Sequence, residues 1–211
     1  MSGVVISIDK KIVGWKVTDG SNRSIEFKDS FAPKRPLELT CDIHQVNIRG
    51  ENWTILVGLL NERPYEIMGG LSKYIDIGKK TSCGTIIKNP RKTVNSRYDL
   101  KIGYNGDGFL IKDIVTVFDN PNHGSLTRMI SMSLRHGVPI NYIVEQLQKD
   151  KDADLFSFSK VISRCLKKYI IDGTKVSNGV VSCNCDHKED RHIVYQEGCA
   201  TCLTCGYAKC G

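Results

Sequence analysis

The chain has 211 residues, of which 40% are hydrophobic and 25% charged, and its formal net charge is +7. This balance is typical of globular domains, and the length allows one large domain or two small ones. The sequence shows no run of 18 apolar residues and no signal peptide, so it predicts neither a membrane protein nor a secreted one. We expect a cytoplasmic protein, in which thiols stay reduced and the nine cysteines form no disulfide framework.

The first half of the chain has the pattern of β-strands. Residues 1–32 contain β-branched runs such as "GVVISI" and "KIVGWKV" and predict a β-rich segment of unknown role. The stretch "SFAPKRP" at 30–36 contains two prolines and predicts a linker. Residues 33–118 then predict a β-meander region. In it the almost wholly apolar "WTILVGLL" is a buried strand, and "FLIKDIVTVF" is a further strand.

Residues 119–172 change to helical periodicity. Asn120-Pro121 predicts the start of a helix, and Gly137 predicts its end. A second helix follows Pro139, and "FSKVISRCLKKYI" predicts a third, which places Cys165 on its inward face as a core residue. The predicted fold class is therefore α+β: a β-meander region, a three-helix segment and a C-terminal tail resembling a zinc ribbon.

The tail, residues 178–211, holds six of the nine cysteines. Cys183-x-Cys185 and Cys199-x2-Cys202 are two pairs separated by a predicted β-hairpin, the arrangement by which a zinc ribbon surrounds one ion with four thiolates. So short a segment buries little apolar surface, and a metal would replace the missing core. We therefore expect zinc at Cys183, Cys185, Cys199 and Cys202.

The remaining pair, Cys205 and Cys210, predicts a second chemistry. Two thiols separated by four residues can close a small disulfide, and the neighbouring Lys209 favours the Cys210 thiolate. This pair is the expected redox shuttle. An alternative stays open, in which Cys202 and Cys205 form the second zinc pair and Cys199 and Cys210 are spare.

Other residues with ligand chemistry are less specific. The first cysteine pair is tighter than the usual C-x2-C, so His187 or His192 could replace one thiolate, although exposed histidines are the simpler interpretation. Cys41-x2-His44 has a metal-like spacing. Positions three apart on a strand point to opposite faces, however, so we expect no shared ion there. Cys83 is expected to be structural, because no general base can be placed beside it.

Four stretches in this order make the sequence resemble a known family. They are "RPLELTCDIHQVNIRGENWTILVGLLNERPYEI", "DNPNHGSLTRMISMSLRHGVPINYIVEQLQK", "FSKVISRCLKKYI" and "YQEGCATCLTCGYAKCG". The chain resembles, over about residues 33–211, the C-terminal region of the large subunit of adenosylcobalamin-dependent (class II) ribonucleotide reductases, including phage-type versions. Cys183-x-Cys185 departs from the family's C-x2-C, which leaves the first metal ligands in question.

The resemblance implies a share in reducing ribonucleotides to deoxyribonucleotides. In that family a C-terminal cysteine pair re-reduces the active-site dithiol and is recharged by thioredoxin or a similar donor. The spacing of Cys205 and Cys210 is similar to that shuttle pair. The family's catalytic barrel would lie N-terminal to the matched region, and 211 residues leave no room for it. We therefore expect a barrel-bearing large-subunit fragment as partner, with adenosylcobalamin bound in the assembled enzyme and not by this chain.

A function of another class is the alternative. A zinc ribbon on a domain of charge +7 could be a nucleic-acid- or protein-binding module without redox activity. The sequence has no long block of Lys and Arg, and the tail offers few aromatic or basic side chains for one binding face. We therefore do not expect a nucleic-acid partner.

Overall fold

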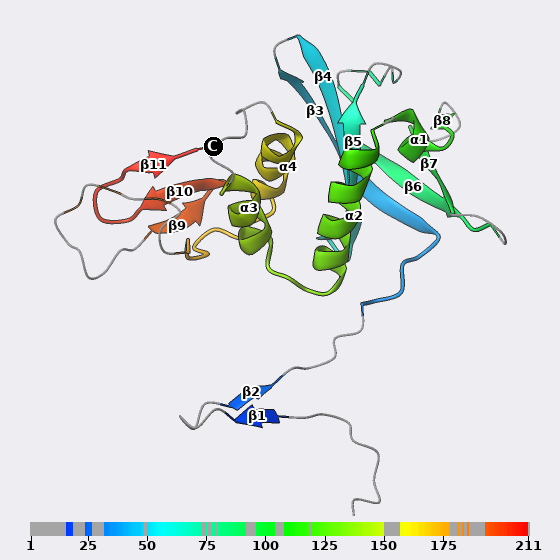
Figure 1. Ribbon diagram of the computed structural model, residues 1–211. Coiled ribbons are helices and arrows are strands. Elements are labelled where there is room, and N and C mark those ends of the chain that lie inside the picture. Colours follow the sequence, from blue (N-terminus) through cyan, green and yellow to red (C-terminus); the bar gives the residue numbers. More distant parts are fainter. Residues whose placement is uncertain are drawn as a thin grey trace, which may run out of the picture. The chain divides into compact units, whose positions relative to one another are not determined.

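The computed structural model (Figure 1) describes residues 16–18, 24–26, 32–48, 50–72, 75, 77–78, 80–91, 96–103, 108–118, 120–149, 157–177, 181, 183, 185 and 193–210. The chain forms two units, Met1–Ala32 and Pro33–Gly211. In the first unit β1 (Lys16–Thr18) and β2 (Ser24–Glu26) pair antiparallel. The strand predicted at "GVVISI" lies outside the described residues.

A six-stranded antiparallel sheet forms the framework of the second unit, in the order β5-β4-β3-β6-β7-β8. Strands β3 to β5 form one meander and β6 to β8 another, and the chain crosses from β5 to pair β6 with β3. The strands are β3 (Glu38–Ile48), β4 (Glu51–Leu60), β5 (Arg63–Leu71), β6 (Cys83–Asn89), β7 (Arg97–Ile102) and β8 (Phe109–Ile111).

Alternate residues of the central strands face two different cores, as the two-residue period of a strand requires. Trp53, Ile55 and Val57 of β4 belong to the core shared with the helices. Leu56 and its cross-strand partner Ile43 belong to the core on the opposite face. Both faces of β4 are therefore covered, which explains why "WTILVGLL" is almost wholly apolar.

The same alternation separates Cys41 from His44, as predicted. Cys41 is 1% exposed in the second core, and burial raises the pKa of its thiol to about 12. His44 lies on the helical side, where its Nε2 is 2.8 Å from the Tyr169 hydroxyl. That hydroxyl donates to Asp42 Oδ2 at 2.6 Å. Cys41 and His44 therefore do not share a ligand site.

Four helices occur in the described residues: α1 (Ile114–Val117), α2 (Pro121–Arg135), α3 (Ile140–Gln148) and α4 (Phe158–Lys167). In Figure 1, α2 lies along β5, and α3 and α4 pack against each other beside it. The last three occupy the regions predicted to be helical, so the fold is α+β as expected. None of these helices is long and apolar enough to cross a membrane.

The predicted helix ends are confirmed at α2. The Asn120 side chain accepts the N–H groups of Asn122 and His123, and Pro121 occupies the first helical position. After the helix, Gly137 adopts φ +75°, the left-handed conformation of a C′ residue. Cys165 on α4 is 2% exposed in the helical core, also as predicted, and burial raises its pKa to about 11.

One expectation was wrong. The run "FLIKDIVTVF" is not one strand, because Asp113 takes a left-handed φ of 53° and the chain turns from β8 into the one-turn α1. Ile114 is fully buried in the second core, and this packing outweighs the strand propensity of the β-branched residues around it. The boundary between the two units falls within the linker predicted at 30–36. From Pro33 onward this stretch contacts the sheet, where the Pro33 carbonyl accepts the Tyr65 hydroxyl at 2.6 Å.

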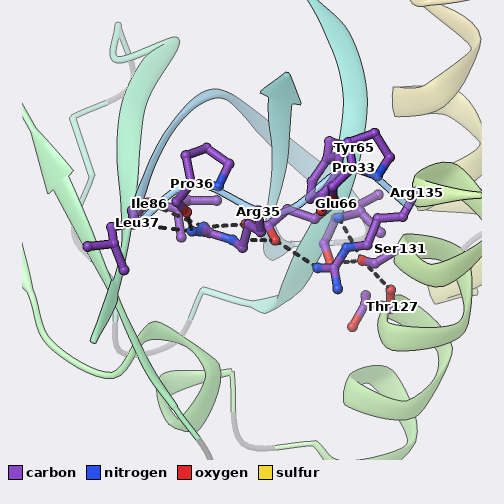
Figure 2. A network of polar contacts seen from close by, with 11 residues as sticks. Pro33, Arg35, Pro36, Leu37, Tyr65, Glu66, Ile86, Thr127, Ser131 and Arg135 are labelled. Atoms are coloured by element: carbon purple, nitrogen blue, oxygen red, sulfur yellow. Dashed lines mark hydrogen bonds and ion pairs between the residues drawn. The ribbon is translucent and has the colours of Figure 1, made fainter. Parts of the chain in front are cut away.

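A buried ion network fixes this docked segment to the sheet and to α2 (Figure 2). Glu66 on β5 is fully buried and lies between Arg35 and Arg135. Arg35 Nη2 is 2.7 Å from Glu66 Oε1, and Arg135 Nη2 is 2.9 Å from Oε2. Opposite it on β4 stands Gly58, where a Cβ would come within 2.8 Å of Glu66 Cγ. The network therefore joins three elements that are distant in sequence.

We expect Glu66→Gln to lower the free energy of unfolding by about 3 kcal/mol, because it leaves two guanidinium groups without their carboxylate. Urea denaturation measures the change, and Glu38→Gln, the same substitution at an exposed position of β3, serves as the control. A loss below about 1 kcal/mol at Glu66, similar to a surface substitution, would contradict this account of the network.

Candidate metal and redox site

The cysteine-rich end forms a three-stranded antiparallel sheet with the order β11-β10-β9. Its strands are β9 (Ile193–Gln196), β10 (Cys199–Cys202) and β11 (Ala208–Lys209). Glu197 and Gly198 connect the first two with φ values of +48° and +75°. Two consecutive left-handed residues make a type I′ turn, which matches the twist of a hairpin. This turn fixes the register in which Cys199 pairs with Gln196.

Alternation along β10 divides its two cysteines. Ala200 and Cys202 point to the buried face, at 5% and 1% exposure, whereas Cys199 and Thr201 point to the partly exposed face. Residues three apart on a strand lie on opposite faces. Cys199 and Cys202 therefore belong to different sites.

On the buried face, Cys202 meets three other thiols. Its Sγ lies 3.6 Å from the Sγ of Cys183 and 3.6 Å from that of Cys185. With Cys205, these four sulfurs all lie within 4.8 Å of one another. We name Cys183, Cys185, Cys202 and Cys205 the thiol cluster.

The thiol cluster has the dimensions and chemistry of a metal site. Four thiolates about 2.3 Å from one tetrahedral ion lie about 3.8 Å from one another, close to the observed separations. Four sulfur ligands of this kind favour zinc among the common divalent ions. The donor set therefore fits the metal that the sequence predicted, although with Cys205 in the place of Cys199.

The loop from Cys202 to Gly206 prepares one of these sulfurs for ionisation. The Gly206 N–H donates to the Cys202 carbonyl at 2.9 Å and closes a tight loop. The backbone N–H groups of Cys205 and Thr204 point at the Cys202 sulfur and lower the pKa of its thiol to about 6. The neighbouring thiols of Cys205 and Cys183 instead raise the pKa of Cys185. A bound cation would remove the remaining protons from the cluster.

On the other face, Cys199 is joined to Cys210 by a disulfide. Cys210 follows β11, in which Lys209 pairs with Ala200, so the two cysteines come opposite each other at the next position of the ladder. Their Cα atoms are 4.5 Å apart, within the range that a disulfide spans. Cys210 is exposed and Cys199 half-buried, so the bond is accessible from solvent at the Cys210 end.

The structure thus groups the six cysteines differently from the first assignment. It brings together Cys183, Cys185 and Cys202 as expected, but it exchanges Cys199 and Cys205. This is the alternative that the sequence left open. The strand alternation of "CATC" followed by a C-x2-C loop is the signal that distinguishes the two, and His187 and His192 lie outside the described residues.

The ribbon of β9, β10 and β11 is attached to the helical core. Tyr195 of β9 is 1% exposed and packs in that core, and burial together with the nearby Glu145 raises its pKa to about 12. Residues 173–176 run along β9, with the Val176 N–H donating to the Ile193 carbonyl at 3.0 Å. At the hairpin turn, a Cβ on Gly198 would lie 3.4 Å from the Lys167 carbonyl of α4. The two cysteine sites are therefore held against α3 and α4.

Comparison with known proteins identifies the family of the sheet and helices to which these sites are attached. A family model described as the NrdJ homologue C-terminal domain matches residues 39–171, more than half of the chain. The chain belongs to this family. NrdJ is class II ribonucleotide reductase, so this NrdJ-related domain has a ribonucleotide reductase-related role. The match covers the sheet and helices, and the two cysteine sites of this NrdJ homologue follow it. No curated protein and no solved structure matches the chain.

Metal content distinguishes the two faces of β10. We expect Cys205→Ser to reduce bound zinc from about one ion per chain to near zero, because it removes a cluster ligand, whereas Cys199→Ser keeps the ion. Elemental analysis of the purified variants measures this. Cys83→Ser, at an exposed cysteine of β6, is the control. Retention of zinc by Cys205→Ser with its loss from Cys199→Ser would contradict the grouping.

Proposed function

We propose that this chain relays reducing equivalents to a ribonucleotide reductase, using the Cys199–Cys210 pair as the redox group and the thiol cluster as a structural zinc site. One observation carries the proposal: a single short strand carries one cysteine of an accessible disulfide on one face and, on its buried face, Cys202 of the thiol cluster. Membership of the NrdJ-related family supports the reaction class.

The zinc ion, when bound, cross-links the ribbon and so supplies stability that a larger domain would gain from an apolar core. The ribbon's own core consists of the buried Ile193, Ala200 and Cys202, with further cysteines packed against it. Thiolates held by zinc are less available for exchange than free ones. The cluster therefore keeps the ribbon folded while the Cys199–Cys210 pair changes oxidation state.

The relay needs two thiol–disulfide exchanges. A donor thiolate attacks the accessible Cys210 sulfur, the Cys199–Cys210 bond breaks, and Cys199 leaves as a thiolate. The second donor thiol then attacks the donor sulfur of the mixed disulfide. The donor's own disulfide forms, the bond to Cys210 breaks, and Cys210 leaves as a thiolate. Two electrons and two protons have passed to the pair. The reduced pair transfers them in the same way to an acceptor disulfide, which becomes a dithiol.

The partners follow from the resemblance to class II ribonucleotide reductases. A thioredoxin- or glutaredoxin-like protein is the proposed donor. The proposed acceptor is the active-site disulfide of a barrel-bearing large-subunit fragment, in which adenosylcobalamin is bound. The attachment of the ribbon to α3 and α4 supports such a role, because those helices lie within the family-matched region and can orient the pair toward a docked barrel.

Reductant choice tests the proposal. In an assay with the barrel-bearing fragment and adenosylcobalamin, we expect Cys199→Ser and Cys210→Ser each to abolish turnover driven by thioredoxin. A small dithiol that reaches the active site directly should still support turnover, because it bypasses the pair. Cys83→Ser is the matched control and should behave as the unmodified chain.

Normal thioredoxin-driven turnover in both variants would sink the relay. If the variants also keep their zinc, the alternative of a zinc-ribbon binding module without redox activity gains support. The same preparations then serve for binding assays with oligonucleotides and with the barrel-bearing fragment, which decide between a nucleic-acid and a protein partner.

A further inference from the structure

A cavity of about 1060 Å³ lies beside the ion network, between β5, β7, α1 and α2, and contains none of the six tail cysteines. Four arginines line it, and they come from separate parts of the chain. Arg97 is on β7, Arg128 and Arg135 are on α2, and Arg91 follows β6. Arginines that converge on one cavity from distant segments are placed there by the fold and not by local sequence.

Two of the four guanidinium groups are fixed from behind by buried carboxylates. Arg135 Nη2 binds Glu66 at 2.9 Å, and Arg97 Nη2 binds Asp99 Oδ2 at 2.8 Å. Asp99 is itself held by the Asp113 N–H at 2.9 Å. Each arginine side chain nevertheless keeps 32% exposure. A guanidinium has five N–H donors, so such an anchored arginine can bind its carboxylate and a ligand anion together.

The charges at the cavity favour an anion. Asp113 is the one carboxylate among the described lining residues, against four guanidinium groups. When the buried Glu66, Asp99 and Arg35 behind the wall are included, five arginines stand against three carboxylates. Two positive charges remain. Arg128 contributes one of these charges from an exposed position, where its Nη2 donates to the Ser125 hydroxyl at 3.2 Å.

Apolar side chains form part of the remaining wall. The sheet side presents Ile67 and Met68, and α1 and α2 present Val115 and Met132. Tyr98 and Phe118 add aromatic rings. Polar side chains lie between these apolar groups, and they are Ser96, Thr116, Asn120, Thr127 and Ser131. A free phosphate would leave this apolar surface unused, whereas a ligand with a phosphate end and a flat or apolar end matches both kinds of wall.

We propose that this cavity binds a phosphate-bearing small molecule of nucleotide size, with its phosphates toward Arg128 and Arg135 and its ring toward the apolar wall. The cavity volume is that of a site for a small ligand. A nucleic-acid strand would instead need a groove that continues along the surface. The proposal does not depend on the cysteine sites or on the relay.

Isothermal titration of the full chain with ATP as the probe tests this proposal. We expect saturable one-to-one binding that is about tenfold weaker in Arg128→Gln, which removes one charge-assisted contact from the cavity. Arg63→Gln, the same change at the exposed start of β5 and outside the cavity lining, is the control and should bind as the unmodified chain. Tripolyphosphate, which lacks the ring, should bind more weakly than ATP.

Several results would overturn the proposal. They are no binding of ATP, equal weakening by Arg128→Gln and Arg63→Gln, or equal affinity for tripolyphosphate and ATP. The last would show that the apolar wall takes no part. Tight binding of a single-stranded oligonucleotide without binding of ATP would identify a nucleic-acid surface instead of a small-molecule site. Thermal unfolding of each variant confirms that the chain is folded in the comparison.

Discussion

The two-residue period of β10 is the constraint on which the rest of the cysteine chemistry depends. A strand cannot direct Cys199 and Cys202 to the same site, because side chains three apart face opposite ways. Cys202 therefore joins the thiol cluster from the buried face, and Cys199 forms the disulfide with Cys210 on the accessible face. Six cysteines within 28 residues can then serve two purposes without exchanging partners, because the strand itself separates them.

The ribbon is short of apolar surface, and it compensates in two ways. Within the ribbon, sulfur atoms occupy positions that a larger domain would fill with aliphatic side chains. Outside it, Tyr195 enters the helical core, and burial of a side chain of this size contributes about 1.5–3 kcal/mol. The Cys199–Cys210 pair is thus carried by a ribbon that packs against the helical core. Attachment to a folded domain limits the directions in which the pair can be presented.

The sequence predicted those parts of the fold that depend on local rules. The cap at Asn120, the end at Gly137 and the buried Cys165 each follow from neighbours in the chain, and the structure confirms them. Parts that depend on distant partners were missed. In the sequence, Arg35 lies in a predicted linker with no partner nearby, and only the fold brings it beside Glu66 and Arg135. The cavity arginines, likewise, have no common motif. The grouping of the cysteines could be predicted in part. The sequence indicates that Cys199 and Cys202 face opposite sides of β10, but it does not give the register in which the ribbon strands pair.

Mapping the cysteines of the zinc-loaded, air-oxidised chain tests the central claim most directly. The chain is alkylated before and after removal of zinc by a chelator, digested without reduction and analysed by mass spectrometry. The account predicts a Cys199–Cys210 linked peptide in both samples, with the thiol cluster protected from alkylation until the chelator is added. A Cys205–Cys210 linked peptide, together with zinc-dependent protection of Cys199, would contradict it.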